Sequence, residues 1–326
     1  MTLLIGTRGS ALALAQAGDI AREITVRTGV ATELVPVTTH GDVSRESLSS
    51  LGGTGVFASA LREFLLAGKC DLVVHSMKDL PTQHYPGLAI GAVPVRADAR
   101  DALCARDGLT LDTLPEGARV GTGSPRRAAQ LAVRRPDLVV VDIRGNVDTR
   151  LGFVSSGELD AVVLAAAGLG RLGRTDRITE YFGLDSWPTA PAQGALAIEV
   201  RDESHSDDLT RALAAIHDEA AHAAAVAERS ILSRLEAGCA APIGAHAAVS
   251  GNTLSLIGAV YAPDGSGQLV LSGSGEFTAG IAADERANFA RTAERTIIET
   301  AEFVGCALAD ELLAGGAATL APLTQD

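Results

Sequence analysis

The sequence is poor in aromatic residues and in positive charge. Only 3% of its 326 residues are aromatic, with a single Trp, and the formal net charge at pH 7 is -13. Proteins hold nucleic acids largely by stacking bases on aromatic rings and by neutralising phosphates with basic side chains. The composition therefore argues against a general nucleic-acid partner and against an anionic membrane surface.

Long apolar runs and metal-binding motifs are also missing. No run reaches the roughly 18 to 20 apolar residues that a membrane span requires, and the N-terminal ALALA is shorter than the apolar part of a secretion signal. The four cysteines form no CxxC and the seven histidines no HExxH, so we expect neither a disulfide framework nor a metal site. We expect a soluble, cytoplasmic protein.

Short aliphatic runs alternate with amphipathic stretches over the first 200 residues. Runs such as LLIGT, DLVVHS and DAVVLAAAG are typical of buried strands, and the segments between them carry apolar residues at helical spacing. This alternation predicts an α/β protein. The last hundred residues differ: one long helical stretch (212–238), a strand hairpin or meander, and a final helical segment (283–316) predict a separate small α+β domain.

Two segments of the chain resemble each other. IGTRGSALALAQ (5–16) and VGTGSPRRAAQL (120–131) both run from a strand through Gly-Thr and a turn to a Ser that is followed six residues later by Gln. Chance similarity in a Gly- and Ala-rich chain is the alternative explanation. We interpret the repeat as two α/β lobes with matching first strand–helix units, which would enclose a cleft suited to a ligand.

Basic and hydroxyl side chains come directly after five of the predicted strands. Ligands of open α/β sheets bind at the carboxyl ends of the strands, so these side chains should share one rim. Between residues 119 and 150, seven arginines accompany three aspartates inside an acidic chain. The rim residues are Arg8, Ser10, Ser76, Lys78, Asp79, Thr122, Ser124, Arg126, Arg127, Arg144, Arg150 and Arg171.

Two adjacent arginines begin a predicted helix. Ser124 is a natural N-cap and Pro125 a natural first helical residue, which places Arg126 and Arg127 in the first turn, where the helix dipole disfavours cations. Free amides and guanidinium groups together form an anion site, with a solvated helix face as the alternative. A P-loop is absent, and spread arginines suit several carboxylates better than one compact phosphate group.

Asp79 and Cys239 are the remaining candidates for chemistry. Asp79 either forms a plain surface ion pair with Lys78 or, inside a cleft of cations, stabilises positive charge that develops on a substrate. Cys239 lies in EAGCAAPIGAH, a loop without a packing pattern, where a thiol can be exposed and reactive. The other three cysteines fall within apolar or helical patterns and are expected to be buried.

Six motifs, in this order over residues 5 to about 245, resemble the porphobilinogen deaminase (hydroxymethylbilane synthase) family. They are GTRGSALALAQ, HSMKDLPT, GTGSPRRAAQL, IRGNVDTRL, APAQGALAIEVR and EAGCAAPIG. The resemblance implies an α/β fold in which two lobes, like those of type 2 periplasmic binding proteins, form a cleft beside a small C-terminal α+β domain. We expect the first lobe over 1–97 with 194–214, the second over 98–193, and the C-terminal domain over 215–326.

The resemblance also implies a reaction. A dipyrromethane cofactor is attached to Cys239 by a thioether bond, and four porphobilinogen molecules are joined to it head to tail with loss of ammonia. Hydrolysis then releases linear hydroxymethylbilane, in tetrapyrrole biosynthesis. The acetate and propionate groups of the pyrroles would explain the arginine-rich rim. Asp79 matches the carboxylate that stabilises the cationic azafulvene left by deamination, and a monomer is implied.

The family's motifs assign roles to individual residues. Two departures concern Thr54, where the family often has lysine, and Pro125, where leucine is commoner but proline suits the helix start. The implied cofactor-binding residues are Cys239, Lys78, Ser76, Thr122, Ser124, Arg126, Arg127 and Arg144. The implied substrate-binding residues are Arg8, Ser10, Gln16, Arg150, Arg171 and Gln193, with Phe57 as a candidate for ring stacking.

Two other functions compete with this assignment. A non-enzymatic receptor for an anionic small molecule would share the lobes and the arginines, but it gives no role to Cys239 or Asp79. A nucleic-acid binder that uses the arginine-rich segment would bind less tightly as salt increases. The acidity and the shortage of aromatic residues disfavour it.

Overall fold

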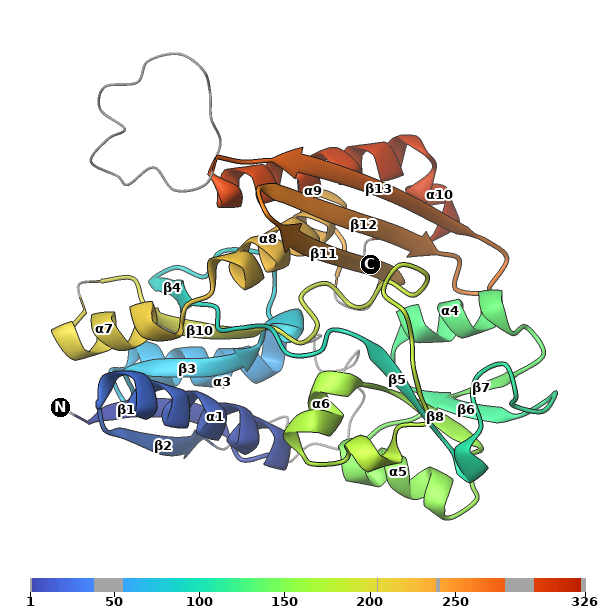
Figure 1. The fold of residues 1–326 in the computed structure, drawn as a ribbon, viewed down its shortest axis with the longest axis horizontal. Helices are drawn as coiled ribbons and strands as arrows, with labels where there is room; N and C mark the ends of the chain where they lie inside the picture. Colours follow the sequence, from blue (N-terminus) through green and yellow to red (C-terminus); the bar gives the residue numbers. More distant parts are fainter. Residues whose placement is uncertain (1, 38–54, 204, 239–240, 279–295, 324–326) are drawn as a thin grey trace.

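The computed structural model describes residues 2–37, 55–203, 205–238, 241–278 and 296–323, with only the backbone of 55–57. The described residues form three sheets in three bodies: two α/β lobes side by side and a C-terminal domain that lies across both (Figure 1). The predicted architecture of two α/β lobes and a small α+β domain is confirmed.

The first lobe has a five-stranded mixed sheet in the order β2-β1-β3-β10-β4. Its core is formed by aliphatic side chains such as Leu3, Ile5, Leu72 and Ile198. The strands are β1 (Leu3–Arg8), β2 (Thr32–Val37), β3 (Leu72–Ser76), β4 (Leu88–Ala92) and β10 (Leu196–Arg201), and the helices are α1 (Ala11–Thr28), α3 (Gly55–Leu66), the 3-10 turn η1 (Met77–Asp79) and α7 (Asp207–Ile216).

The second lobe has a sheet in the order β7-β6-β8-β5-β9. Leu103, Val120 and Val163 pack on one face of it with Trp187. The strands are β5 (Asp101–Ala105), β6 (Arg119–Thr122), β7 (Val139–Asp142), β8 (Ala161–Ala165) and β9 (Glu180–Tyr181), and the helices are η2 (Arg106–Gly108), α4 (Pro125–Arg134), α5 (Val147–Ser155), α6 (Ala166–Arg171) and η3 (Thr175–Arg177).

The two lobes repeat one strand arrangement. β1 pairs in parallel with β2 and β3, and β6 pairs in parallel with β7 and β8. Each sheet then receives an antiparallel strand, β10 in the first lobe and β5 in the second, and each of these comes after a segment that crosses between the lobes. The internal repeat seen in the sequence therefore reflects equivalent first strand–helix units, and Ser10 and Ser124 cap the helices of these units.

The C-terminal domain contains an antiparallel meander, which is one of the two arrangements, hairpin or meander, predicted for this region. Its antiparallel strands are β11 (Ile243–Ser250), β12 (Thr253–Tyr261) and β13 (Gln268–Glu276), and its helices are α8 (Glu219–Arg234), α9 (Ile297–Ala314) and α10 (Ala317–Leu320). The helices α8 and α9 pack together on the sheet around an aliphatic core. The first part of the predicted 283–316 helix lies outside the described residues.

The prediction of one helical stretch over 212–238 is wrong. The chain breaks at His217, whose backbone is extended, and Asp218 then caps α8 by accepting a 2.7 Å hydrogen bond from the Ala221 amide. Ile216 belongs to the core of the first lobe. We therefore propose that the C-terminal domain begins after α7, between residues 216 and 219, and not at 215.

The two crossing segments, 93–100 and 183–195, are bound to the C-terminal domain through Glu228 of α8. This fully buried carboxylate accepts two hydrogen bonds from the Arg96 guanidinium, at 2.6 and 3.0 Å, and one from the Ala192 amide. It also accepts a 2.7 Å hydrogen bond from the Ala247 amide of β11. One side chain thus joins both connectors to the third domain.

Candidate active site

Five of the predicted site residues line one pocket in the first lobe. Arg8, Ser10, Gln16, Ser76 and Asp79 surround a cavity of about 110 Å³ at the carboxyl ends of β1 and β3. The helix α1 starts at this edge because Ser10 caps it, and the buried Gln16 then donates a 2.8 Å hydrogen bond from Nε2 to Ser76 Oγ. The sequence motifs GTRGS and HSMKD therefore meet in space.

The turn η1 carries Lys78 and Asp79 at the end of β3. Asp79 is exposed and lines the pocket, whereas Lys78 is half-buried and donates from Nζ to Gln193 Oε1 at 3.3 Å. Burial lowers the pKa of Lys78 to about 8; the adjacent Asp79 carboxylate opposes this shift, and the Arg127 guanidinium adds to it. Lys78 is thus directed towards the crossing segment and the second lobe.

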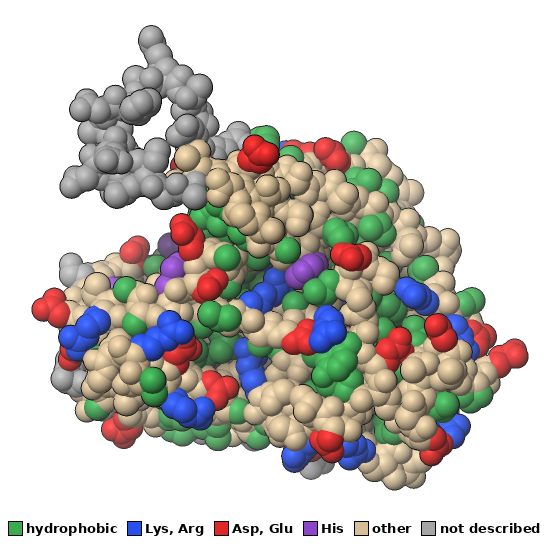
Figure 2. Space-filling view, in the orientation of Figure 1, with side chains coloured by type: hydrophobic (Ala, Val, Ile, Leu, Met, Phe, Trp, Pro, Cys, Tyr) green, Lys and Arg blue, Asp and Glu red, His purple; other side chains and the backbone are tan. Residues whose placement is uncertain are grey.

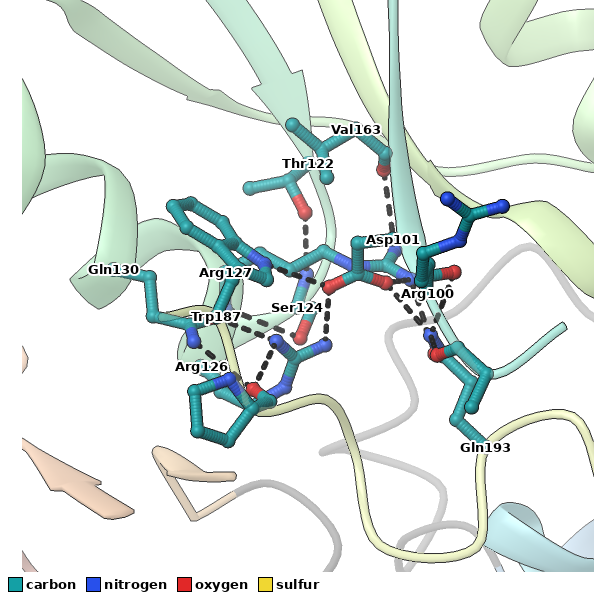
Figure 3. A network of polar contacts seen from close by, with 12 residues as sticks. Arg100, Asp101, Thr122, Ser124, Arg126, Arg127, Gln130, Val163, Trp187 and Gln193 are labelled. Atoms are coloured by element: carbon teal, nitrogen blue, oxygen red, sulfur yellow. Dashed lines mark hydrogen bonds and ion pairs between the residues drawn. The ribbon is translucent and has the colours of Figure 1, made fainter. Parts of the chain in front are cut away.

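Arg126 and Arg127 both reach one buried carboxylate, as Figure 3 shows. Nη2 of Arg126 lies 2.9 Å from Asp101 Oδ2, and Nη2 of Arg127 lies 2.7 Å from Asp101 Oδ1. Asp101 is fully buried and also accepts a hydrogen bond from Trp187 Nε1 at 3.0 Å. Burial alone would raise the pKa of Asp101, but the two guanidinium groups outweigh it and hold the pKa far below its usual value.

The arginine pair therefore contributes less free charge than its sequence suggests. One of its two positive charges is balanced by Asp101, and both residues are at most 5% exposed. Within the described residues, the buried Nε atoms of Arg126 and Arg127 have no hydrogen-bond partner. Buried N–H groups that lack a partner are costly, so a carboxylate that reached them would be held strongly.

Arg144 and Arg150 extend this positive region along the edge of the second lobe. Arg150 is half-buried, and burial together with the like charges of Arg127 and Arg144 lowers the pKa of its guanidinium. Arg144 is exposed and lies 3.3 Å from Asp142. Figure 2 shows Lys and Arg side chains near the middle of one face, between the lobes and below the C-terminal domain. The mutual repulsion would be relieved by bound anions.

Thr122, Ser124 and Arg171 lie at the same edge of the second lobe. Buried Thr122 ends β6 and accepts a 3.2 Å hydrogen bond from the Ser124 amide, and Ser124 caps α4. Arg171, at the end of α6, donates to the carbonyl of Gly194 at 3.0 Å. Gly194 has a φ of 89°, and a Cβ there would lie 2.5 Å from the Ala97 carbonyl oxygen. Only glycine lets the two crossing segments approach this closely.

Gln193 connects the two halves of the site. It is fully buried in a crossing segment, and its Nε2 donates to Asp101 Oδ1 at 2.8 Å. Its Oε1 accepts from Arg127 of the second lobe and from Lys78 of the first, each at 3.3 Å. A single amide thus links the HSMKD and SPRR motifs.

Two predicted residues cannot be placed. Cys239 lies outside the described residues, and for Phe57 only the backbone, in α3, is described.

Within the described ranges, no group of three His, Cys, Asp or Glu side chains could hold a metal ion. In the same part of the chain, no helix is long and apolar enough to cross a membrane.

Sequence reasoning missed Asp101, Glu228 and Arg229. The rim was predicted from the residues at the carboxyl ends of strands, but β5 runs antiparallel to β8, so the first residue of β5 lies at the edge where parallel strands end. An acid that opens an aliphatic strand, as in DALCA, was the available signal for Asp101. Glu228 and Arg229 belong to a helical stretch whose charges look solvent-exposed in the sequence.

Solved structures similar to this chain include solute-binding proteins. The methionine-binding protein MetQ has a TM-score of 0.44 and 10% identity, over 68% of this chain and 92% of that one. A periplasmic substrate-binding protein of an ABC transporter from Coxiella burnetii has a TM-score of 0.42 and 14% identity, over 70% and 96%.

Family models and sequence relatives cover nearly the whole chain. Residues 3–208 match "Porphobilinogen deaminase, dipyromethane cofactor binding domain", and residues 222–276 match "Porphobilinogen deaminase, C-terminal domain". The porphobilinogen deaminase of Leifsonia xyli subsp. xyli (strain CTCB07) is 59% identical over 323 residues, which are 98% of this chain and 94% of that protein. That of Thermobifida fusca (strain YX) is 56% identical over 263 residues, 80% and 82% of the two chains. The chain belongs to the porphobilinogen deaminase family, the transferases that build hydroxymethylbilane on a dipyrromethane cofactor.

Proposed function

We propose that the rim of the two lobes binds the cofactor and the growing pyrrole chain through their carboxylates, and that Asp79 is the catalytic carboxylate. The observation that carries this proposal is the incompletely balanced positive charge of the second lobe. Arg126 and Arg127 have buried Nε atoms without a partner in the described residues, and Arg150 lies among like charges. The guanidinium groups of these three arginines are suitable ligands for acetate and propionate groups.

The residues present fit a dipyrromethane in this region. When bound, this group supplies the pyrrole carbon to which the first substrate is joined. Lys78, Ser76, Thr122, Ser124, Arg126, Arg127 and Arg144 are proposed to hold its side chains, with Cys239 as its anchor. Among the described cysteines, burial raises the pKa of Cys70 to about 11 and that of Cys104 to about 12, so these two thiols are poor nucleophiles at neutral pH.

Arg8, Ser10, Gln16, Arg150, Arg171 and Gln193 are proposed to bind and orient the incoming substrate. The carbon–nitrogen bond of its aminomethyl group breaks, and a bond forms to an unsubstituted pyrrole carbon, which loses its proton. Ammonia carries away the amino group and that proton. Asp79 lines the first-lobe pocket beside Arg8 and Gln16, where its negative charge would stabilise the positive charge that develops on the pyrrole.

The test of this function is the mass of the intact protein, together with peptide mapping around Cys239. We expect an excess mass equal to two linked pyrrole units on the peptide that contains Cys239, and its absence in Cys239→Ser. A bare thiol that stays bare after incubation with porphobilinogen, without release of ammonia, would favour the anion-receptor alternative.

We also propose that the protein acts as a monomer in the cytoplasm, which a sedimentation measurement and cell fractionation can check.

Loading of the cofactor should depend on the charge of Lys78. Because its pKa is lowered from 10.5 to about 8, the ammonium group is present below pH 8 and is lost as the pH rises through that value. Protein produced without porphobilinogen should therefore acquire the cofactor more slowly above pH 8. Lys78→Arg stays charged, so its loading rate, measured by mass spectrometry, should lack this decline. Identical pH profiles for the two proteins would exclude a role for the Lys78 charge.

A further inference from the structure

One arginine of the C-terminal domain binds the turn that carries Asp79. Arg229 of α8 donates from Nη1 to the carbonyl oxygens of Met77, at 3.1 Å, and Leu80, at 2.8 Å. Its Nη2 donates to the carbonyl oxygen of Pro81 at 2.7 Å. These three carbonyl groups lie on both sides of Asp79 in the chain, and a charged donor makes each hydrogen bond stronger than a neutral one would.

The helix α8 is shaped to approach this turn closely. Ala221, Ala225 and Arg229 are spaced at four-residue intervals and so lie on one face of the helix. The two alanines belong to the same buried hydrophobic cluster as Met77 and Leu80, which are 1% and 3% exposed. Small side chains on this face bring the helix near enough for the Arg229 guanidinium to span three carbonyl groups.

The opposite side of α8 is fixed as well. Gly305 of α9 lies so close to α8 that a Cβ there would meet the Ala227 carbonyl oxygen at 2.4 Å. Glu228, the neighbour of Arg229, is bonded to Arg96 and to the Ala192 amide in the two crossing segments. The guanidinium of Arg229 therefore projects from a helix that cannot shift easily.

The turn is also held from its other side by a crossing segment. The Met77 amide donates to the Ala195 carbonyl oxygen at 3.1 Å, and Lys78 reaches Gln193. The exposed carboxylate of Asp79 therefore projects from a turn whose backbone is hydrogen-bonded to α8 on one side and to the crossing segment on the other.

We propose that Arg229 is a positioning residue for the reaction: it fixes the η1 turn, and with it the Asp79 carboxylate, relative to the C-terminal domain. The inference rests on the role proposed above for Asp79. Arginine suits this task because its rigid planar fork presents five donors, whereas a lysine ammonium would reach fewer of the three carbonyl groups. Accurate placement matters because a shift of about 1 Å can lower a rate about 100-fold.

The test compares Arg229→Met with Arg234→Met. Arg234 lies on the same helix, but it is exposed and pairs with Asp310 of α9. In protein whose mass shows that the cofactor is attached, we expect Arg229→Met to lower kcat by about 10- to 100-fold with KM unchanged, and Arg229→Lys to restore part of the loss. Amide hydrogen exchange of the 72–85 peptide should be faster in Arg229→Met only. An unchanged kcat, or an equal fall in Arg234→Met, would overturn the proposal.

A second comparison separates this inference from the role of Asp79. In an Asp79→Asn background, adding Arg229→Met should lower the residual turnover by less than twofold, because the carboxylate that it positions is already gone. A further loss as large as in the wild type would overturn the positioning role alone. Normal turnover of Asp79→Asn itself would instead remove the proposed role of Asp79. If Arg229→Met does not fold, Arg229→Lys serves in both comparisons, and an unchanged kcat in it overturns the inference.

Discussion

Asp101→Asn is expected to lower the free energy of unfolding by about 3 to 5 kcal/mol, because it leaves two buried guanidinium groups without their counter-charge. Arg126 and Arg127 are at most 5% exposed, and both are bonded to this carboxylate. Asparagine has nearly the same shape, but its amide NH₂ would face guanidinium donors. The loss is a large part of the roughly 5 to 15 kcal/mol that stabilises a typical domain.

Urea denaturation measures this loss, and Asp98→Asn is the matched control. Asp98 is three residues away and also pairs with an arginine, Arg100, but that pair is exposed and should contribute at most about 1 kcal/mol. Equal destabilisation by the two substitutions would show that the buried pair adds nothing beyond a surface ion pair. The pKa of Asp101 is lower in the folded protein than in the unfolded chain. The stabilisation by its carboxylate is therefore fully present at pH values above the unfolded-state pKa, and it is lost as the pH falls from there towards the folded-state pKa.

Asp79→Asn is expected to lower turnover about a thousandfold while the cofactor stays attached. A unit charge pair at about 4 Å and an effective dielectric constant near 20 is worth about 4 kcal/mol, which corresponds to roughly three powers of ten in rate. Asp79 is exposed, so its replacement should change the midpoint of thermal unfolding little. Single-turnover release of ammonia measures the loss of turnover, and the intact mass shows whether the cofactor is still attached.

Asp107→Asn is the matched control for this substitution. Asp107 is also an exposed acid in a three-residue 3-10 turn, η2, but that turn comes after β5 at the sheet edge opposite the site. Its replacement should leave turnover unchanged. Turnover near the wild-type rate in Asp79→Asn would remove this carboxylate from the mechanism.

The positions of the parallel strands and of most of their helices could be predicted from the sequence. The helix α6 could not, because DAVVLAAAG was interpreted as one strand, whereas β8 ends at Ala165 and the helix begins at Ala166. Aliphatic runs ended by polar or glycine residues mark β1, β3, β6 and β8, and Ser124 with Pro125 marks the start of α4, because these local preferences agree with the fold. The rim at their carboxyl ends was predicted by the same rule. The Arg8, Ser76 and Asp79 side chains do meet in one pocket.

Contacts between distant segments could not be predicted in the same way. The counter-charge for Arg126 and Arg127 comes from the start of an antiparallel strand, and pairing direction is decided by the tertiary fold. The break at His217 was hidden by strong helix formers on both sides of it. The sequence also does not indicate which charged side chains of α8 face inward, because Glu228 is buried by segments more than thirty residues away in sequence.

Glu228 has a mechanical consequence for a site that must accommodate a lengthening product. Its carboxylate holds Arg96 in one connector and the Ala192 amide in the other, and it is itself held by β11. Sliding either connector would break these bonds, whereas swivelling the lobes around the carboxylate would keep them. A rotation of the lobes that preserves these bonds would therefore turn about Glu228, and the parts of the rim farthest from this carboxylate would gain the most room.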